Sequence, residues 1–171
     1  KLFEENFSKY INMKYAVGVS SATAGLHLSL LSIDIKNDDE VIVPSKTFIS
    51  TANSALYCNA KPVFCDVDES TFQLNPLKLE QLITSKTKAI IPVHLGGNIC
   101  EMNEIKNIAK KHNLIIIEDA AHAHGSTLNG KMAGTFGHIG VFSFYPDKIM
   151  ASSDGGIIVT NDRKIFEKLL L

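Results

Sequence analysis

The chain has 171 residues, of which 45% are hydrophobic and 20% are charged, as in an ordinary globular domain with a sizeable core. Its 17 basic residues balance its 18 acidic residues, so no charge bias indicates a nucleic-acid partner. No apolar run approaches the roughly 18 residues of a membrane span. The three cysteines are widely spaced and form no C-x-x-C pair, which predicts reduced thiols in or near the core of a cytoplasmic protein.

Residues 1–10 alternate charged and apolar side chains like an amphipathic helix, and seven short apolar runs follow them. Most of these runs are continuously apolar, which is typical of strands covered on both faces. The predicted strands are residues 15–20, 40–44, 62–68, 88–95, 114–120, 139–145 and 156–162.

Segments with helical periodicity lie between the strands, at residues 23–33, 47–58, 76–83 and 101–112. The second of these helices has an apolar face formed by Phe48, Ala52, Ala55 and Leu56. Strands that alternate with helices predict a mainly parallel sheet. Only about ten residues join the last two strands, fewer than a parallel crossover needs, so the last strand is expected to run antiparallel. A further helix starts at the end of the chain, and we expect the chain to be part of a longer protein.

Ligands of such sheets bind beyond the carboxyl ends of the strands. The polar residues of this chain gather at those positions, in residues 20–23, 44–48, 94–98, 119–124 and 143–148. The first of these segments opens a helix, where free backbone N–H groups suit a phosphate, although plain helix capping is the better interpretation of this segment taken alone. It contains neither a Walker lysine nor G-x-G-x-x-G.

Two adjacent carboxylates, Glu118 and Asp119, end an apolar strand, where a charge is costly unless it meets a cation. One interpretation is a salt bridge or helix cap. A second is a metal site formed by Asp119 with His94, His122 and His124, although no H-E-x-x-H or Cys–His spacing supports it. A third is that Asp119 pairs with the protonated heteroaromatic nitrogen of a cofactor.

Lys148 lies in a loop of small residues between two apolar strands, which is unusual for a solvated lysine. A partly desolvated lysine is suited to Schiff-base chemistry. Together with a phosphate cradle at residues 21–23, the Asp119 carboxylate and the Phe48 ring, it supplies the groups that pyridoxal 5'-phosphate requires. The combination favours this cofactor more strongly than any one residue does.

These motifs resemble the sugar-nucleotide aminotransferases of the DegT/StrS type, a branch of the fold-type I pyridoxal phosphate enzymes. The similarity covers essentially the whole chain and keeps the order of the motifs. The matching blocks are KYAVGVSSATAGLHLSLL, DDEVIVPSKTFISTANSAL, AKPVFCDVDESTFQLNP, TKAIIPVHLGGN, IIEDAAHAHGSTLNGKMAGTFG and FSFYPDKIMASSDGGIIVTND.

The resemblance implies an α/β fold, with a three-layer α/β/α large domain whose seven-stranded sheet is mostly parallel and whose last strand is antiparallel. Residues 1–171 would be the pyridoxal-phosphate-binding large domain, without the C-terminal small domain that family members carry. It also implies a homodimer whose active sites take groups from both subunits.

The resemblance assigns three catalytic side chains. Lys148 would bond to the cofactor's aldehyde and then shuttle protons, and Asp119 would keep the pyridine nitrogen protonated. His122 would lie near the cofactor's phenolic oxygen, where the family often has glutamine.

It also assigns residues that bind the cofactor. Phe48 would stack on the ring, while the backbone amides of Ala22 and Thr23 and the hydroxyl of Ser143 would bind the phosphate. Ala22 replaces the glycine of the family's frequent S-G-T, which is compatible with this role if its φ is negative.

The implied reaction transfers an amino group from an amino acid, glutamate by analogy, to a keto sugar linked to a nucleotide. One alternative is a pyridoxal-phosphate-dependent sugar dehydratase, but such 3-dehydratases replace the lysine with histidine, and this chain retains Lys148. A second is a non-catalytic regulatory protein on the same fold, against which the joint presence of Lys148, Asp119 and Phe48 argues.

Overall fold

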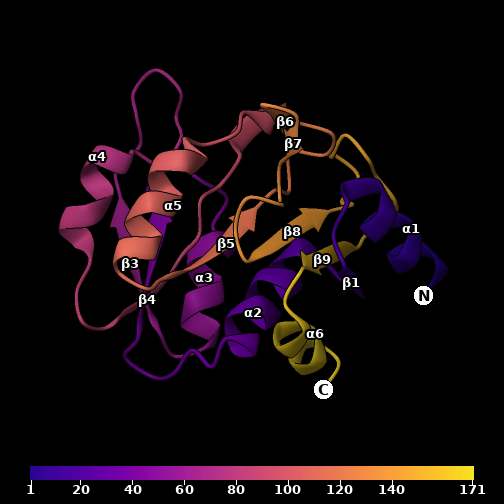
Figure 1. The fold of residues 1–171 in the computed structure, drawn as a ribbon, viewed down its shortest axis with the longest axis horizontal. Helices are drawn as coiled ribbons and strands as arrows, with labels where there is room; N and C mark the ends of the chain where they lie inside the picture. Colours follow the sequence, from indigo (N-terminus) through magenta and orange to yellow (C-terminus); the bar gives the residue numbers. More distant parts are fainter.

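A seven-stranded sheet forms the centre of the computed structural model, which describes residues 1–171 (Figure 1). Its strands are β1 (Tyr15–Val19), β2 (Glu40–Pro44), β3 (Lys61–Cys65), β4 (Thr87–Ile90), β5 (Ile115–Asp119), β8 (Ile139–Ser143) and β9 (Gly156–Thr160). Their spatial order is β1-β9-β8-β5-β4-β2-β3. Strand β9 is antiparallel to both of its neighbours, and the other adjacent pairs are parallel, as the short last connection predicts.

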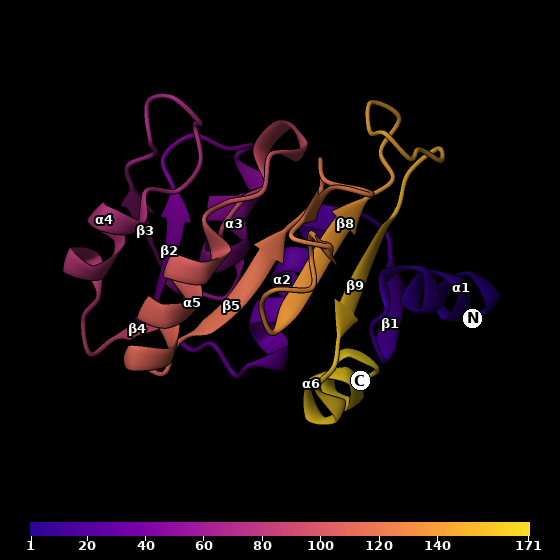
Figure 2. The ribbon, with the colours of Figure 1, turned by 45° about the horizontal axis from the view of Figure 1, so that its top comes forward.

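Helices cover both faces of the sheet (Figure 2). One layer contains α2 (Ala22–Ser32), α3 (Ser50–Tyr57) and α6 (Arg163–Leu169); the other contains α1 (Leu2–Ile11), α4 (Pro76–Leu79) and α5 (Met102–Lys111). Along β2, Val41 and Val43 pack in the core with α2 and α3, whereas Ile42 packs in the core with α4 and α5. Burial of both faces explains why the strands read as continuous apolar runs. The predicted three-layer α/β architecture is therefore confirmed.

Six of the seven predicted strands end earlier in the structure than predicted, by one to five residues. The strand predicted over 88–95 ends at Ile90, shortly before Pro92, which has no N–H group to donate to a neighbouring strand. Beyond this proline, Val93 still forms an isolated parallel bridge with Asp119. The strand predicted over 139–145 ends at Ser143. Ser143 and Gly156 form the last residue pair between β8 and β9. The N–H of Phe144 still donates to the Gly155 carbonyl at 2.9 Å, and the loop that carries Lys148 follows.

The helix predicted over residues 47–58 begins three residues later, at Ser50. Ala52 and Ala55 are buried as expected, but Leu56 is exposed and Phe48 precedes the helix with 70% of its surface exposed. The assumed apolar face was wrong at its two largest residues. Phe48 is thus free to form part of a pocket wall.

A small hairpin was not predicted. It pairs β6 (Thr127–Leu128) with β7 (Lys131–Met132), and its turn residues Asn129 and Gly130 have φ values of 51° and 75°. Asn-Gly is the dipeptide that such turns favour, so the signal was present in the sequence. Short 3₁₀ turns, η1 (Glu80–Leu82) and η2 (Leu95–Gly97), complete the fold.

The predicted thiols are confirmed, because all three cysteines are free and buried. None of the helices combines the length and the apolar character that crossing a membrane requires.

Candidate active site

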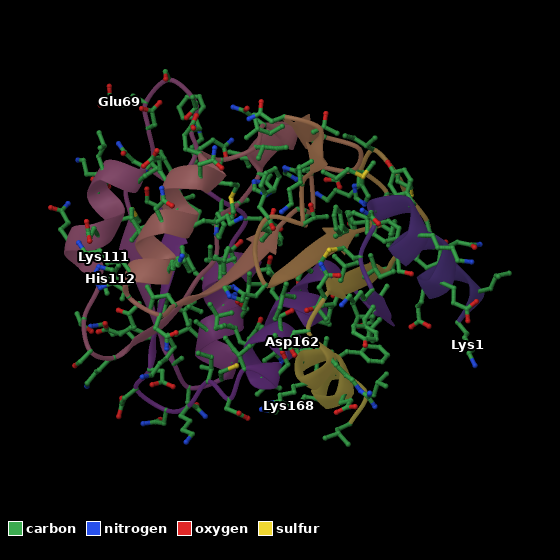
Figure 3. All side chains as sticks on the ribbon, in the orientation of Figure 1. Lys1, Glu69, Lys111, His112, Asp162 and Lys168 are labelled. Carbon is green, nitrogen blue, oxygen red and sulfur yellow. The ribbon has the colours of Figure 1, made fainter.

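A cavity of about 590 Å³ opens at the carboxyl ends of the central strands, a size typical of small-molecule sites. Every site residue expected from the sequence lines it: Ala22, Thr23, Phe48, Asp119, His122, Ser143 and Lys148. These side chains come from four separate segments of the chain, which the parallel sheet brings to one edge. His112 follows the C-terminal end of α5 (Figure 3). It lines a second cavity, of about 480 Å³, which contains none of these site residues.

The N-terminus of α2 forms one wall of the cavity. Ser21 caps the helix, and its hydroxyl accepts a hydrogen bond from the N–H of Ala24 at 3.2 Å. Ala22 and Thr23, in the first turn, have N–H groups without partners within the helix. Ala22 has a negative φ, so its replacement of glycine causes no backbone strain here.

The start of β9 lies against this helix terminus. A Cβ atom at Gly156 would come within 2.6 Å of the Ser21 carbonyl carbon and 2.7 Å of the Ala22 nitrogen. Only glycine allows the two backbones to approach so closely. Ser143, paired with Gly156 at the end of β8, contributes a buried hydroxyl to the same wall.

Asp119 ends β5 with its side chain almost fully buried. Its Oδ2 accepts a hydrogen bond from the Thr51 hydroxyl at 2.9 Å, and its Oδ1 accepts one from the N–H of Ala121 at 3.2 Å. Burial raises the pKa of this carboxyl above its ordinary value, although these two hydrogen bonds act against the rise. None of the ion pairs in the structure includes Asp119. The cavity therefore presents a buried carboxylate without a cationic protein partner.

Lys148 reaches into the cavity from the loop after β8, and 14% of its side chain is exposed. Its Nζ atom lies 3.0 Å from Nε2 of His122 and 2.9 Å from Oδ1 of Asp147. The N–H of Gly96 approaches Nδ1 of His122 at 3.3 Å. When Nδ1 accepts this bond, the ring proton is on Nε2 and Lys148 accepts it as a free amine; an ammonium at Lys148 requires the other tautomer. Proton exchange between the two is possible in the tautomer that carries the proton on Nδ1, because Nε2 can then take a proton from the Lys148 ammonium and return it.

The neighbouring carboxylate Glu118 has a different environment. It accepts hydrogen bonds from Nε2 of His94 at 2.8 Å and from the N–H groups of Gly134 and Gly137 at 2.7 and 2.5 Å. The glycine-rich segment 134–137 therefore binds a buried carboxylate through its backbone. The salt-bridge interpretation applies to Glu118, while Asp119 faces the cavity.

The metal-site interpretation finds no support. His94 is bound to Glu118, and both ring nitrogens of His124 are buried between Phe142 and Phe144 without a hydrogen-bond partner. No group of three His, Cys, Asp or Glu side chains is arranged to hold a metal ion.

Sequence reasoning missed Thr47 and Thr51. Their hydroxyls are 3.0 Å apart, and Thr51 contacts Asp119 directly. Their i, i+4 spacing in TFIST was a usable signal, because residues four apart in the predicted helix lie on the same face.

Comparison with known proteins gives the family. The sequence model of the DegT/DnrJ/EryC1/StrS aminotransferase family matches residues 1–171. The chain is 48% identical over 169 residues to GDP-perosamine synthase of Caulobacter vibrioides, covering 99% of this chain and 46% of that protein. It is 46% identical over 168 residues to dTDP-3-amino-3,6-dideoxy-alpha-D-galactopyranose transaminase of Aneurinibacillus thermoaerophilus. That match covers 98% of this chain and 46% of the transaminase.

Among solved structures, NtdA of Bacillus subtilis, determined "with bound cofactor pmp", superposes with a TM-score of 0.91 at 35% identity, covering 98% of this chain and 38% of that chain. The chain spans less than half the length of these relatives. The match across all of residues 1–171 shows that the chain belongs to the DegT/DnrJ/EryC1/StrS aminotransferase family.

Proposed function

We propose that the chain is the cofactor-binding large domain of a pyridoxal-phosphate-dependent aminotransferase acting on nucleotide-linked keto sugars. The observation that carries this proposal is the convergence of Lys148 and Asp119 on one cavity that also contains a helix N-terminus and an exposed aromatic ring. Each of these groups has a counterpart in the chemistry of the cofactor.

The donor set fits the cofactor. The unpartnered N–H groups of Ala22 and Thr23 and the hydroxyl of Ser143 suit a phosphate. The carboxylate of Asp119 lacks a cation, which a protonated ring nitrogen would supply. Phe48 offers an uncovered ring face at the cavity wall. When bound, the cofactor supplies an electron sink for amino-group transfer.

The side chains of the cavity supply a nucleophile and groups that hold or move protons. Lys148 offers Nζ as a nucleophile and then as an acid and base, and His122 holds or releases the proton exchanged with it at 3.0 Å. Asp147 holds the ammonium form of Lys148 in place at 2.9 Å. Phe48 forms an apolar part of the cavity wall.

The substrates are inferred from the relatives. The names of two of them contain a nucleotide-linked amino sugar, which supports a nucleotide-linked keto sugar as the acceptor. We propose glutamate as the amino donor. Phe48, Tyr145 and Ile149 expose apolar surface in and near the cavity wall, which supports a homodimer in which a second subunit completes the site. Three free cysteines are compatible with a cytoplasmic enzyme.

The proposal is tested with full-length protein and pyridoxal phosphate. Wild type is expected to bind the cofactor with a visible absorbance band, and borohydride should attach the cofactor covalently to Lys148, as located by peptide mass spectrometry. Lys148→Ala should abolish the attachment. Lys46→Ala is the matched control, because Lys46 stacks on Phe72 and does not line the cavity.

An unchanged reducible attachment in Lys148→Ala would show that the role given to Lys148 is wrong. Failure of the wild type to bind the cofactor would favour a regulatory protein. Production of an amino sugar from a keto sugar and glutamate distinguishes transamination from sugar dehydration.

A further inference from the structure

Asp119 receives its side-chain hydrogen bond from a residue that lies behind the cavity wall. Thr51 is the second residue of α3, is fully buried, and does not line the cavity. Its Oγ1 is 2.9 Å from Oδ2 of Asp119. Thr47, which does line the cavity, places its own Oγ1 3.0 Å from Oγ1 of Thr51.

The direction of these bonds follows from the number of protons available. An ionised carboxylate only accepts hydrogen bonds, and a hydroxyl has a single proton to donate. Thr51 therefore donates to Asp119, and the Thr47 hydroxyl must donate to Thr51. The two hydroxyls form a relay that points from the cavity wall toward the carboxylate.

This relay counteracts the cost of burying a charge. Donors directed at a carboxylate stabilise its ionised form, and burial does the opposite. The other groups that face Asp119 are the N–H of Ala121, which lowers the pKa of the carboxyl more than Thr51 does, and the imidazoles of His122 and His94, which lower it less. Thr51 is the single side chain that forms a hydrogen bond with the Asp119 carboxylate.

We propose that Thr51, oriented by Thr47, is a positioning residue that holds Asp119 ionised and in the rotamer that faces the cavity. This inference rests on the proposed function, in which Asp119 meets the ring nitrogen of the cofactor. Because Thr47 directly precedes Phe48, the relay also links the segment that carries the aromatic wall to the carboxylate.

The test measures the dissociation constant for pyridoxal phosphate of full-length apoprotein variants across a pH series. Thr51→Val keeps the shape and removes the hydroxyl; loss of a hydrogen bond to a charged group should weaken binding about 10-fold or more. The deficit should grow as the pH falls, because Asp119 then becomes protonated at a higher pH than in wild type. Thr51→Ser should restore affinity to within about 3-fold.

Ser54→Ala is the matched control. Ser54 is also buried on α3, but its hydroxyl donates to the Thr51 carbonyl at 2.8 Å and not to the relay. The affinity of Ser54→Ala for pyridoxal phosphate should stay within about 2-fold of wild type at every pH. A loss of affinity equal to that of Thr51→Val would show that disturbed helix packing causes both losses, and it would overturn the inference.

Two further variants complete the experiment. If Thr51→Val does not fold, Thr47→Val carries the test, with an expected loss of about 3-fold that increases at low pH. Wild-type affinity in the folded valine variants at all pH values would overturn the inference. Asp119→Asn reports on the proposed function itself. If it binds as wild type does, the proposed function fails; if it loses binding while Thr51→Val does not, only the relay is wrong.

Discussion

The Nζ atom of Lys148 lies 3.0 Å from Nε2 of His122, although the two residues are 26 positions apart in the chain. β5 and β8 are adjacent parallel strands, so the segments after their carboxyl ends meet. Nδ1 of His122 accepts a hydrogen bond from the N–H of Gly96. Whether this bond forms decides which ring nitrogen carries the proton, and so couples the tautomer of His122 to the protonation state of Lys148.

This pair predicts a specific effect of His122→Gln. Glutamine can keep a hydrogen bond to Lys148 but cannot take up its proton. We expect cofactor affinity within a few-fold of wild type and kcat reduced by about 100-fold, the usual size of a lost general acid–base group. Steady-state kinetics and cofactor titration of the same preparation measure both. An unchanged kcat would limit His122 to hydrogen bonding.

Asp119→Asn should stabilise the protein in the absence of cofactor. Burial raises the pKa of Asp119 above its ordinary value of 3.8, so the folded chain holds this proton more tightly than the unfolded chain. The contribution of Asp119 to stability is complete below pH 3.8 and is lost as the pH rises through the raised folded value.

At neutral pH the asparagine variant should therefore gain roughly 0.5–2 kcal/mol of unfolding free energy, while losing cofactor binding. Urea unfolding of apoprotein at several pH values measures the gain, which should shrink on acidification. A variant less stable than wild type at pH 7 would contradict this account.

His124 predicts acid sensitivity of the opposite sign. Burial, together with the nearby His122 and Lys148, lowers its pKa from 6.5 to about 4. A lowered histidine pKa means that the unfolded chain binds more protons, so stability is complete above pH 6.5 and is lost as the pH falls toward 4.

His124→Leu removes both the titration and two unsatisfied buried nitrogens, and it should raise stability by about 1 kcal/mol at neutral pH and by more at pH 5. His124→Asn separates the two effects, since it also cannot titrate but keeps a buried polar group. Acid unfolding curves compare them. A leucine variant with the pH dependence of wild type would rule out His124 as the source.

Gly156→Ala tests the close contact between β9 and α2. The added Cβ atom would lie 2.6 Å from the Ser21 carbonyl carbon, so the helix terminus must shift. We expect a loss of about 1–3 kcal/mol in unfolding free energy and weaker cofactor binding. Gly18→Ala is the control, because its Cβ would meet nothing closer than 3.6 Å. Equal effects of the two substitutions in thermal unfolding would exclude the contact as the cause.

Much of the fold was predictable because its signals are local. Continuous apolar runs marked the strands, and the short connection before β9 identified the antiparallel strand. Element ends were less predictable. Strand β4 ends before Pro92, which has no N–H group for a ladder hydrogen bond, and such bonds form only in the assembled sheet. Phe48 was assigned to a helix from its spacing, although the chain turns before Ser50.

The sequence by itself determined the family, the three-layer architecture and the residues that gather beyond the strand ends, because strand and helix periods and motif order are properties of neighbouring residues. Only the tertiary structure decided what those residues contact. It paired Glu118 with His94, left Asp119 without a cation, joined His122 to Lys148, and placed Thr51 behind the carboxylate. Hydrogen bonds and burial between segments far apart in the chain depend on strand order and on ångström-scale approach, which no local pattern encodes.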